Sequence, residues 1–342
     1  MKIVFFGTKP WEKDYLTLKI KDSGVEAGLE FIEGTLNKDN IPQSADCDII
    51  SVFVGSEINR EVIDKFSNLK LIVTRSTGYD HIDLVACEDR GILVASVPSY
   101  GENTVAEHAF ALLLCLSRKI YLGYEQIREN GSFNVDNLQG FDLKGKTLGV
   151  IGTGRIGKHA IKMANGFDMK VIAYDTYPNK ELEKELCFTY HSFNEVLAES
   201  DVITIHVPYL KETHHLLNEE SINKMKPGAY LINTSRGAVV ETEALVKALE
   251  SGHLGGAGLD VLEEEGVIKD ELEFVLRGHP KEHDLKTILS NHVLIDLPNV
   301  IVTPHNAFNT KEAIERILDT TVEDITGFIK GKPVNLVKFK SE

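Results

Sequence analysis

The stretch that decides the fold of this chain is Leu148-Gly149-Val150-Ile151-Gly152-Thr153-Gly154-Arg155-Ile156-Gly157. An apolar run that can form a buried parallel strand leads into Gly152, Gly154 and Gly157, and an amphipathic stretch over residues 156–167 follows. Strand, G-x-G-x-x-G spacing and helix together are the dinucleotide-binding fingerprint in its required context. Gly152 allows a tight turn, Gly154 allows the backbone to approach a pyrophosphate, and Gly157 allows the helix to pack against the strand. The phosphates then lie at the helix N-terminus, where unpaired N–H groups and the helix dipole favour anions.

A carboxylate at the end of the next strand specifies which dinucleotide is bound. The apolar run 169–174 ends at Asp175, where a carboxylate accepts hydrogen bonds from the adenosine ribose hydroxyls. The residues after it, 176–178, are Thr, Tyr and Pro, so no Arg is present to neutralise a 2′-phosphate. The alternative is a structural turn with a surface Asp. The combination of strand, glycines, helix and acid favours NAD over NADP.

The composition is that of a soluble globular enzyme. The chain has 342 residues, which predicts two domains with separate cores, and its hydrophobic content is 42%. The net charge of −15 disfavours nucleic acid or an anionic membrane as a partner. A local Arg can still capture an anionic substrate.

The cysteines and the apolar runs bear on cofactors and location. The four cysteines form no C-x-x-C pair, so neither a disulfide framework nor a zinc site is indicated, and we expect them to be small core residues. The first apolar run, residues 3–6, is too short for a signal peptide, and no run is long enough to span a membrane. We therefore expect a cytoplasmic protein.

Alternating short apolar runs and amphipathic stretches predict an α/β fold with two doubly wound parallel-sheet domains. The predicted strands are 2–6, 28–32, 48–53, 70–74 and 92–95 in the first series, and 147–151, 169–174, 202–206, 229–233, 256–260 and 300–303 in the second. We expect residues 101–304 to form a Rossmann-type NAD domain. Residues 1–100 with 305–342 then form a flavodoxin-like substrate domain, with a cleft between the two.

The helical stretches fix how the domains connect. Residues 103–119 form a long apolar helix that we expect to cross between the domains. A helix over 310–330 is expected to pack back on the first domain, because the residues after about Pro304 are too few to fold alone. The polar segment 263–298 interrupts the pattern and holds two possible helices, 270–276 and 284–289.

Three chemically complementary side chains follow strands of the second series. Arg236 follows strand 229–233, a run of glutamates follows strand 256–260, and His305 follows strand 300–303. Ligands bind beyond the carboxyl ends of strands in open α/β sheets. Hydride transfer to a 2-oxo acid needs an acid for the carbonyl oxygen, a carboxylate that orients it, and a guanidinium for the substrate carboxylate. Glu265 and Glu264 are both candidates within this run of glutamates.

These motifs together resemble the D-isomer-specific 2-hydroxyacid dehydrogenases, over essentially the whole chain. The shared motifs include residues 206–208, 233–237, Asp260 with Glu265, and 304–305, besides the fingerprint with Asp175 and the segments 75–80, 97–100 and 106–108. Tyr100 and the run 304–308 look most similar to the D-lactate dehydrogenase branch. The resemblance implies that Arg236 binds the substrate, that Glu265 pairs with His305, and that His305 is the acid and base. It also implies a homodimer formed through the nucleotide domains, which the apolar helix 104–116 supports.

The fingerprint and the resemblance together assign two sets of ligand contacts. Expected cofactor contacts are Gly152, Gly154, Arg155, Ile156, Gly157, Asp175, Val105, His206, Val207, Pro208, Thr213, Thr234, Ser235 and Asp260. Expected substrate contacts are Phe53, Thr77, Gly78, Tyr100, Arg236 and Phe308. Phe53 stands where the lactate dehydrogenases carry a Tyr, which makes the pocket more apolar. The interval from Glu265 to His305 is also longer than is typical.

Several alternatives remain open from sequence alone. Pyruvate is the favoured substrate, and glyoxylate, hydroxypyruvate, bulkier 2-oxo acids and phosphoglycerate are the others. A different class is an NAD-sensing corepressor-like protein, although the intact Arg, Glu and His set argues against it. His279, His283 and His292 are irregularly spaced in polar surroundings, so we expect surface histidines and no metal site. His214 and His215, in a turn, are also expected at the surface.

Overall fold

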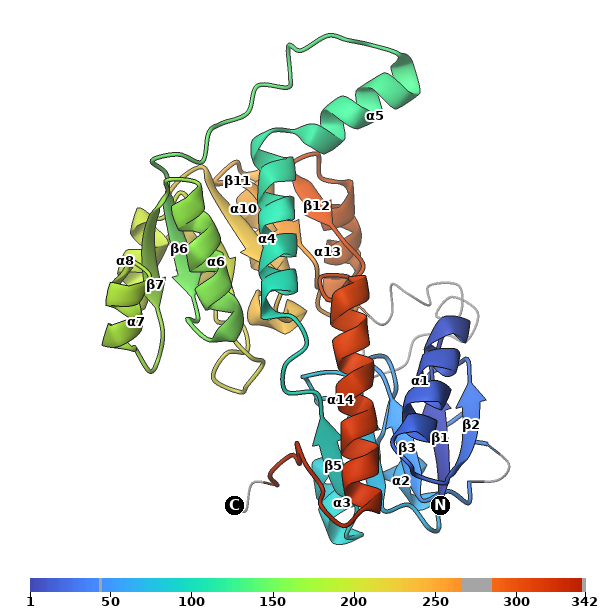
Figure 1. Ribbon diagram of the computed structural model, residues 1–342. Helices are drawn as coiled ribbons and strands as arrows, with labels where there is room; N and C mark the ends of the chain where they lie inside the picture. Colours follow the sequence, from blue (N-terminus) through green and yellow to red (C-terminus); the bar gives the residue numbers. More distant parts are fainter. Residues whose placement is uncertain (43–44, 266–284, 340–342) are drawn as a thin grey trace. The chain divides into compact units, whose positions relative to one another are not determined.

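The computed structural model describes residues 1–42, 45–265 and 285–339 (Figure 1). The chain forms two compact units: Met1–Gly101 with Asn309–Glu342 is unit 1, and Glu102–Phe308 is unit 2. Residues 305–308 therefore belong with the second unit and not, as the sequence suggested, with the first. The reason is that the backbone of this segment is hydrogen bonded to Asp260 of unit 2.

Unit 1 is built on a five-stranded parallel sheet. Its strands are β1 Lys2–Phe6, β2 Gly28–Ile32, β3 Ile49–Val52, β4 Leu71–Thr74 and β5 Leu93–Ser96. Their order is β2-β1-β3-β4-β5, and every pair is parallel. This is the flavodoxin-like order, as predicted. β1, β3 and β4 are almost entirely buried, which is typical of parallel strands covered on both faces.

Helices cover both faces of the unit 1 sheet. One core contains α1 Pro10–Asp22 and α14 Lys311–Ile329, which pack against each other. The opposite core contains α2 Arg60–Asp64 and α3 Leu84–Asp89. The C-terminal helix thus returns to the first unit, because its buried stripe of Leu318, Val322 and Ile325 joins the core of β1 and β4.

Unit 2 is built on a seven-stranded parallel sheet. Its strands are β6 Thr147–Ile151, β7 Lys170–Tyr174, β8 Thr189–Tyr190, β9 Val202–Ile205, β10 Ala229–Asn233, β11 Leu254–Leu259 and β12 Val300–Val302. Their order is β12-β11-β10-β9-β6-β7-β8. Counted from the fingerprint strand β6, this is the doubly wound Rossmann order with one added strand, so the predicted fold class is confirmed. The order in which the chain adds strands reverses between β6 and β9, and a ligand crevice is expected at this point.

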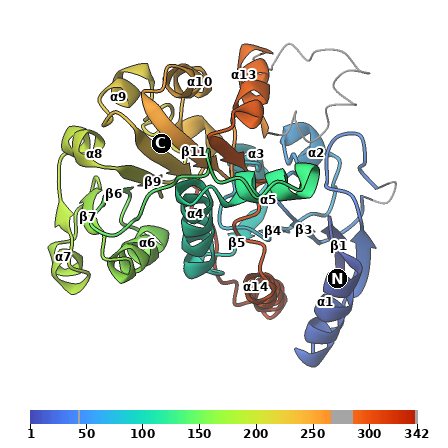
Figure 2. The same ribbon diagram turned by 90° about the horizontal axis from the view of Figure 1, so that it is seen from above.

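The helices of unit 2 form two layers around this sheet (Figure 2). One layer holds α4 Glu102–Ser117, α6 Arg155–Gly166 and α7 Lys180–Glu185. The other holds α8 Phe193–Glu199, α9 Glu219–Asn223, α10 Thr242–Glu250 and α13 Leu285–Asp296, and the short 3-10 helix η1 spans Gly237–Val239. A further helix, α5 Ile120–Asn130, has no buried residue and projects from the rest of the unit (Figure 1).

Several elements differ from the sequence-based expectation. The apolar helix α4 does not link two domains: it lies within unit 2 and packs on α6 and β11. Helices α1, α5, α7 and α9 and the short edge strand β8 were not predicted. The helix expected over 284–289 continues to Asp296 as α13, while the one expected over 270–276 lies outside the described residues.

The cysteines and the helices limit the chemistry of the surface. The four cysteines are free. Burial raises the pKa of Cys47 and of Cys87 to about 12, as expected for inert core thiols. Cys187, however, is exposed and Cys115 is half-buried, so these two are not core residues. No helix in the described part of the chain is long and apolar enough to cross a membrane.

Candidate active site

The fingerprint turn lies between β6 and α6 and contains almost no free space around two of its glycines. Gly152 has a φ of +93°, and a Cβ added there would lie 2.6 Å from the carbonyl oxygen of His206. A Cβ at Gly157 would lie 2.0 Å from the carbonyl oxygen of Gly152. Gly154 is the N-cap of α6, and a Cβ there meets no described atom within 4 Å. Two glycines therefore close the turn, and the third leaves the helix N-terminus open to an anion.

Asp175, at the end of β7, is tied to the same turn. Its Oδ2 accepts hydrogen bonds from the backbone N–H of Thr153 at 2.7 Å and from the Thr153 hydroxyl at 2.8 Å. Its Oδ1 accepts from the backbone N–H of Tyr177 at 2.9 Å, and the Thr153 hydroxyl also contacts the Tyr190 hydroxyl at 2.8 Å. The roles of Thr153 and Tyr190 were missed, because their contact depends on how β6, β7 and β8 align.

The loop after β9 carries four of the expected cofactor residues. His206 Nε2 lies 3.0 Å from the Thr204 hydroxyl, and burial lowers the pKa of His206 to about 4. This imidazole is therefore neutral near pH 7. The Thr213 hydroxyl donates to the carbonyl oxygen of Pro208 at 2.8 Å and accepts from the N–H of Leu210 at 2.7 Å, which closes the loop. Val207 is half-buried against the core.

Arg236 follows β10 on a loop held by Asn233. The buried Asn233 accepts hydrogen bonds through Oδ1 from the N–H and hydroxyl of Ser235, and its Nδ2 donates to the carbonyl oxygen of Arg236 at 2.9 Å. Arg236 Nη1 donates to the carbonyl oxygen of Ser235 at 2.8 Å, and the side chain is partly exposed. Asn233 is thus a positioning residue that the sequence motif contained but did not single out.

His305 and Glu265 lie together in unit 2. Glu265 Oε1 lies 2.6 Å from His305 Nδ1, and the side chains are 28% and 19% exposed. Because a carboxylate accepts, Nδ1 carries a proton and Nε2 is the nitrogen that can exchange one with a substrate. His305 has a φ of +50°, which is uncommon for a residue other than glycine and marks a position held by its surroundings. The chain interval of forty residues does not prevent this contact.

Asp260 is what holds the His305 loop. Its side chain is 0% exposed, and it accepts from the Thr303 hydroxyl at 2.5 Å and from the N–H groups of Asn306 and Ala307 at 2.8 Å each. His108 Nε2 lies 3.3 Å from the same carboxylate. Burial raises the pKa of Asp260, but these donors outweigh burial and hold the pKa below its usual range. The sequence placed Asp260 among the nicotinamide contacts, and that assignment stays a prediction; in the structure its carboxylate is enclosed by the chain, and its hydrogen bonds hold the His305 loop.

The expected substrate residues of unit 1 lie at the carboxyl ends of its strands. The Thr77 hydroxyl donates to the carbonyl oxygen of Val97 at 2.8 Å, and the Ser76 hydroxyl donates to that of Gly78 at 2.6 Å. The guanidinium of the buried Arg75 lies 5.8 Å from the centre of the Phe53 ring. The carbonyl oxygen of Tyr100 accepts from Arg316 Nε. The sequence did not predict these contacts of Arg75 with Phe53 and of Arg316 with Tyr100. Phe308 belongs to unit 2.

Other expected cofactor residues flank the fingerprint within unit 2. Val105 is buried in the first turns of α4, and Ile156 packs against the α4 and α6 core. Arg155 is largely exposed, and its Nη1 lies 3.8 Å from Glu102 Oε1. Among the described residues no group of three or more potential ligands could hold a metal ion. His279 and His283 lie outside the described residues, and His292 is half-buried on α13.

Comparison with known proteins assigns the family. Residues 110–307 match the model of the NAD-binding domain of D-isomer-specific 2-hydroxyacid dehydrogenases. The chain belongs to this family. A 2-hydroxyacid dehydrogenase homologue of Zymomonas mobilis is 38% identical over 97% of this chain and 98% of its own length. The D-lactate dehydrogenase of Aquifex aeolicus, solved with NAD and lactic acid, is 38% identical with a TM-score of 0.86, covering 99% of this chain and all of that one. A glyoxylate reductase of Thermococcus litoralis is 36% identical over 95% of this chain and 96% of its own length.

As a D-2-hydroxyacid dehydrogenase the chain uses NAD, and unit 2 has features that fit this cofactor. The N-terminus of α6 is open at Gly154, where the pyrophosphate would bind. The buried Thr234 hydroxyl has no hydrogen-bond partner within the described residues, and a buried polar atom of this kind fits a ligand group beside it. Thr234 follows β10 and precedes Arg236, and the sequence assigns it to the nicotinamide as a prediction. Asp175 at the end of β7 fits the adenosine ribose.

Proposed function

We propose that this dehydrogenase reduces a small 2-oxo acid, pyruvate first, to the D-2-hydroxy acid with NADH, and catalyses the reverse oxidation. The observation that carries the proposal is the 2.6 Å contact between His305 Nδ1 and Glu265 Oε1. It defines an imidazole with one oriented nitrogen available for proton transfer, on the sheet edge that carries Arg236. Loss of chemistry, as in an NAD-sensing corepressor, gives no reason to retain this arrangement.

The proposed reaction divides between cofactor and protein. NADH supplies the hydride to the carbonyl carbon of the substrate. Nε2 of protonated His305 supplies the proton to the carbonyl oxygen, and the Glu265 carboxylate stabilises the imidazolium form. Arg236 binds the substrate carboxylate and polarises the carbonyl through its fork of N–H donors. In the oxidation direction, neutral His305 accepts the hydroxyl proton of the substrate.

We assign the second contact with the substrate carboxylate to the backbone of Thr77 and Gly78. Among the described residues, neither of these N–H groups donates a hydrogen bond, and the Ser76 and Thr77 hydroxyls fix the turn. Phe53 makes its surroundings more apolar than a Tyr would, which suits the methyl group of pyruvate. Tyr100 and Phe308 remain proposed contacts with the substrate side chain.

Rates of NADH oxidation across a panel of 2-oxo acids test the proposal. The panel is glyoxylate, pyruvate, hydroxypyruvate, 2-oxobutyrate and a branched 2-oxo acid. We expect the highest kcat/KM with pyruvate, and the product should be the D isomer. Preference for glyoxylate would favour the reductase activity that the Thermococcus relative bears in its name. NAD binding without oxidation of NADH by any of the acids would favour a sensing role and contradict the proposal.

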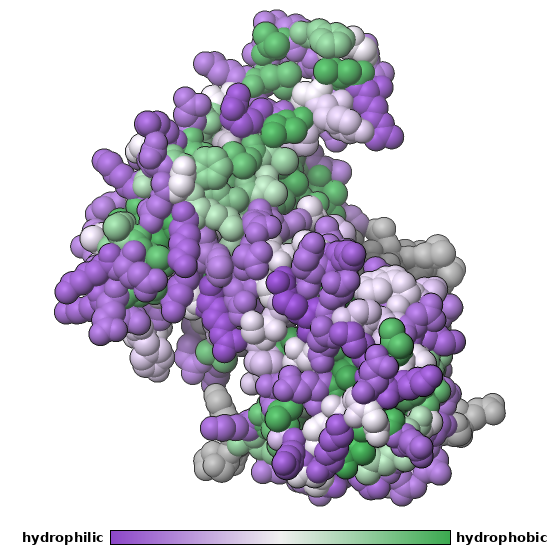
Figure 3. Space-filling view, viewed as in Figure 1, coloured by the Kyte–Doolittle hydropathy of each residue, from purple (hydrophilic) through white to green (hydrophobic). Residues whose placement is uncertain are grey.

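We also propose that the enzyme is a cytoplasmic homodimer joined through unit 2. The apolar side chains of α4, which suggested an interface from sequence, are instead used inside unit 2. Exposed apolar surface is found on α5 and the segment after it, where Ile120 is 53%, Tyr124 62% and Phe133 83% exposed (Figure 3). A projecting apolar arm of this kind marks an interaction site.

Sedimentation velocity at micromolar concentration tests the dimer. The wild-type chain should sediment as a dimer, and Tyr124→Ser with Phe133→Ser should shift it toward the monomer. Val85, which is 65% exposed on α3 of unit 1, supplies the control variant Val85→Ser. A wild-type monomer across the concentration range would remove the proposal.

A further inference from the structure

The three consecutive glutamates after β11 lie in three different environments. Glu265 pairs with His305, and Glu264 has a left-handed backbone with φ of +53°. Glu263 has a side chain only 12% exposed, although a run of acids is usually a solvated face. The burial of Glu263 therefore needs an explanation that the reaction does not supply.

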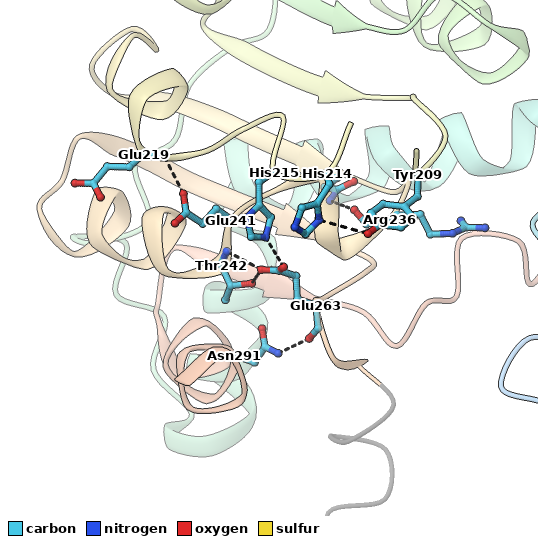
Figure 4. A network of polar contacts seen from close by, with 10 residues as sticks. Tyr209, His214, His215, Glu219, Arg236, Glu241, Thr242, Glu263 and Asn291 are labelled. Atoms are coloured by element: carbon cyan, nitrogen blue, oxygen red, sulfur yellow. Dashed lines mark hydrogen bonds and ion pairs between the residues drawn. The ribbon is translucent and has the colours of Figure 1, made fainter. Parts of the chain in front are cut away.

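The Glu263 carboxylate is saturated with donors from two other elements. His215 Nε2 lies 2.7 Å from Oε1, and Thr242 donates its N–H at 2.9 Å and its hydroxyl at 2.5 Å to Oε2 (Figure 4). Thr242 is the first residue of α10, where the helix dipole favours an anion. The carbonyl oxygen of Glu263 accepts from Nδ2 of the buried Asn291 on α13 at 2.6 Å. Side chain and backbone of Glu263 are thus both fixed.

The same network reaches the loop that carries Arg236. A Cβ at Gly237 would lie 2.0 Å from the carbonyl carbon of Leu262 and 2.3 Å from the N of Glu263, so the two backbones are in direct contact. The N–H of His215 donates to the carbonyl oxygen of Ala238 at 2.8 Å. The sequence suggested that His215 is a surface residue. In the structure it joins Glu263 to Ala238, two residues after Arg236.

The network also reaches the cofactor loop after β9. The rings of His214 and His215 stack with centres 3.9 Å apart, and the Tyr209 hydroxyl lies 3.4 Å from His214 Nδ1 (Figure 4). Tyr209 directly follows Pro208, an expected nicotinamide contact. The buried Glu263 carboxylate is thus connected to the loop after β9 and to the loop that carries Arg236, and its own backbone leads to Glu265.

A buried carboxylate held by hydrogen bonds is weak evidence for stability, since its desolvation cost offsets much of the attraction, whereas such contacts fix geometry strongly. We infer that Glu263, paired with His215, is a positioning residue for the reduction: it fixes the backbone from which Glu265 reaches His305 and against which the Arg236 loop packs. This rests on the proposed roles of Glu265 and His305. Glu263 acts through them and touches no reacting atom.

A double-mutant cycle with Glu265 tests the inference. Glu263→Gln keeps the volume and an acceptor for Thr242 but removes the charge that His215 pairs with. We expect kcat to fall roughly 10-fold to 100-fold, because small displacements of catalytic groups have effects of that size. In a Glu265→Gln background, Glu263→Gln should cause little further loss. Glu264→Gln, which removes the same charge from the adjacent residue, is the matched control and should keep nearly full kcat.

A second readout does not depend on turnover. The 15N chemical shifts of the His305 imidazole, recorded by NMR in the full chain at a fixed pH, report its hydrogen bond to Glu265. They should change in Glu263→Gln in the same direction as in Glu265→Gln, because both variants disturb that hydrogen bond. If no 2-oxo acid were reduced, the proposed function would fail, and these shifts would still test the positioning.

A milder variant covers the case in which Glu263→Gln does not fold. His215 has a φ of +49°, and Asn tolerates that conformation, so His215→Asn removes the imidazole contact to Glu263 without straining the backbone. It should lower kcat several-fold and change the His305 15N shifts in the same direction. Wild-type kcat and unchanged His305 15N shifts in either folded variant would overturn the inference, as would losses that multiply in the Glu265→Gln background.

Discussion

Two carboxylates of this enzyme are equally buried and behave oppositely. Asp260 in unit 2 and Asp324 on α14 of unit 1 are each 1% exposed. Burial raises the pKa of both groups, but at Asp260 several donors outweigh it and the pKa falls below its usual range. At Asp324, burial dominates the single hydrogen bond from Asn335 Nδ2 at 2.8 Å and raises the pKa to about 7, and Oδ2 has no partner among the described residues. The donors around a carboxylate therefore decide its charge, and burial alone does not.

The contrast has a functional side. The donors to Asp260 are the backbone of the His305 loop and two side chains that face it, so its negative charge holds the proposed proton-transfer site. Asp324 holds Asn335, whose carbonyl oxygen accepts from the N–H of Ser96 at the end of β5. That contact ties the C-terminal segment to the unit 1 sheet.

The largest expected effect is at the residue that Asp260 positions. His305→Gln removes the acid and base while preserving most of the side-chain volume, so kcat should fall by roughly 10²-fold to 10⁴-fold. Binding of NADH, followed by its fluorescence, should change little. If His305→Gln bound NADH as the wild type does and also kept near wild-type turnover, His305 would not be the proton donor.

Asp260→Asn should have the next largest effect and change two quantities together. The loop donors lose a charged acceptor, so we expect about 2 kcal/mol lower free energy of unfolding and roughly 10-fold to 100-fold lower kcat. Chemical denaturation and steady-state rates measure the two losses. A stability loss with unchanged kcat would mean that the loop keeps its geometry without this carboxylate, and that Asp260 is only structural.

Asp324→Asn should act in the opposite direction and on stability alone. The folded pKa of about 7 exceeds the ordinary 3.8, so unfolding releases a proton between these values. The stability that protonated Asp324 contributes is full below about pH 4 and is lost as the pH rises to 7. The variant should therefore be more stable than wild type by on the order of 3 kcal/mol at pH 8 and by little at pH 4. Equal gains at both pH values would refute the assigned pKa direction, and kcat should stay unchanged.

Thr303→Val sharpens the comparison with the smallest effect. It removes one donor of several to Asp260, leaving the N–H groups of Asn306 and Ala307 in place. We expect about 1 kcal/mol lower stability and a kcat reduced only a few-fold. A loss as large as that of Asp260→Asn would mean that the Thr303 hydroxyl, and not the number of donors, sets the charge of the carboxylate.

The sequence predicted most of the sheet and much less of what surrounds it. Strands β1, β2, β6 and β10 begin and end at the predicted residues. In β1, β6 and β10 the reason is that parallel strands buried on both faces are largely apolar, whereas β2 is a partly exposed edge strand. Helix α5 was missed, since a helix with no buried residue carries little of the amphipathic signal on which the prediction depends. The apolar pattern of α4 was read correctly as a helix but assigned to the wrong partner, because periodicity does not say what covers a face.

The site shows the same division. Residue types at the strand ends pointed to Arg236, His305 and a run of glutamates, since parallel strands bring their carboxyl ends to one edge. The structure brings Glu265 of that run into contact with His305, and the roles of these residues in the reaction stay predictions. Glu263 and His215 could not be recognised as positioning groups, because a run of acids and a pair of histidines in a turn are ordinary surface patterns. The contacts of Glu263 with Thr242 and His215 join residues 21 and 48 positions apart.

The sequence by itself determined the NAD-binding turn, because the spacing of Gly152, Gly154 and Gly157 after a buried strand satisfies local steric demands that hold in any chain. It also determined the chemical types available at the sheet edge. The tertiary structure alone decided that Asp260 is surrounded by several donors and holds the His305 loop, while the equally buried Asp324 has a single donor, Asn335. The physical reason is that the charge of a buried carboxylate depends on groups brought to it from distant parts of the chain, and no local pattern encodes them.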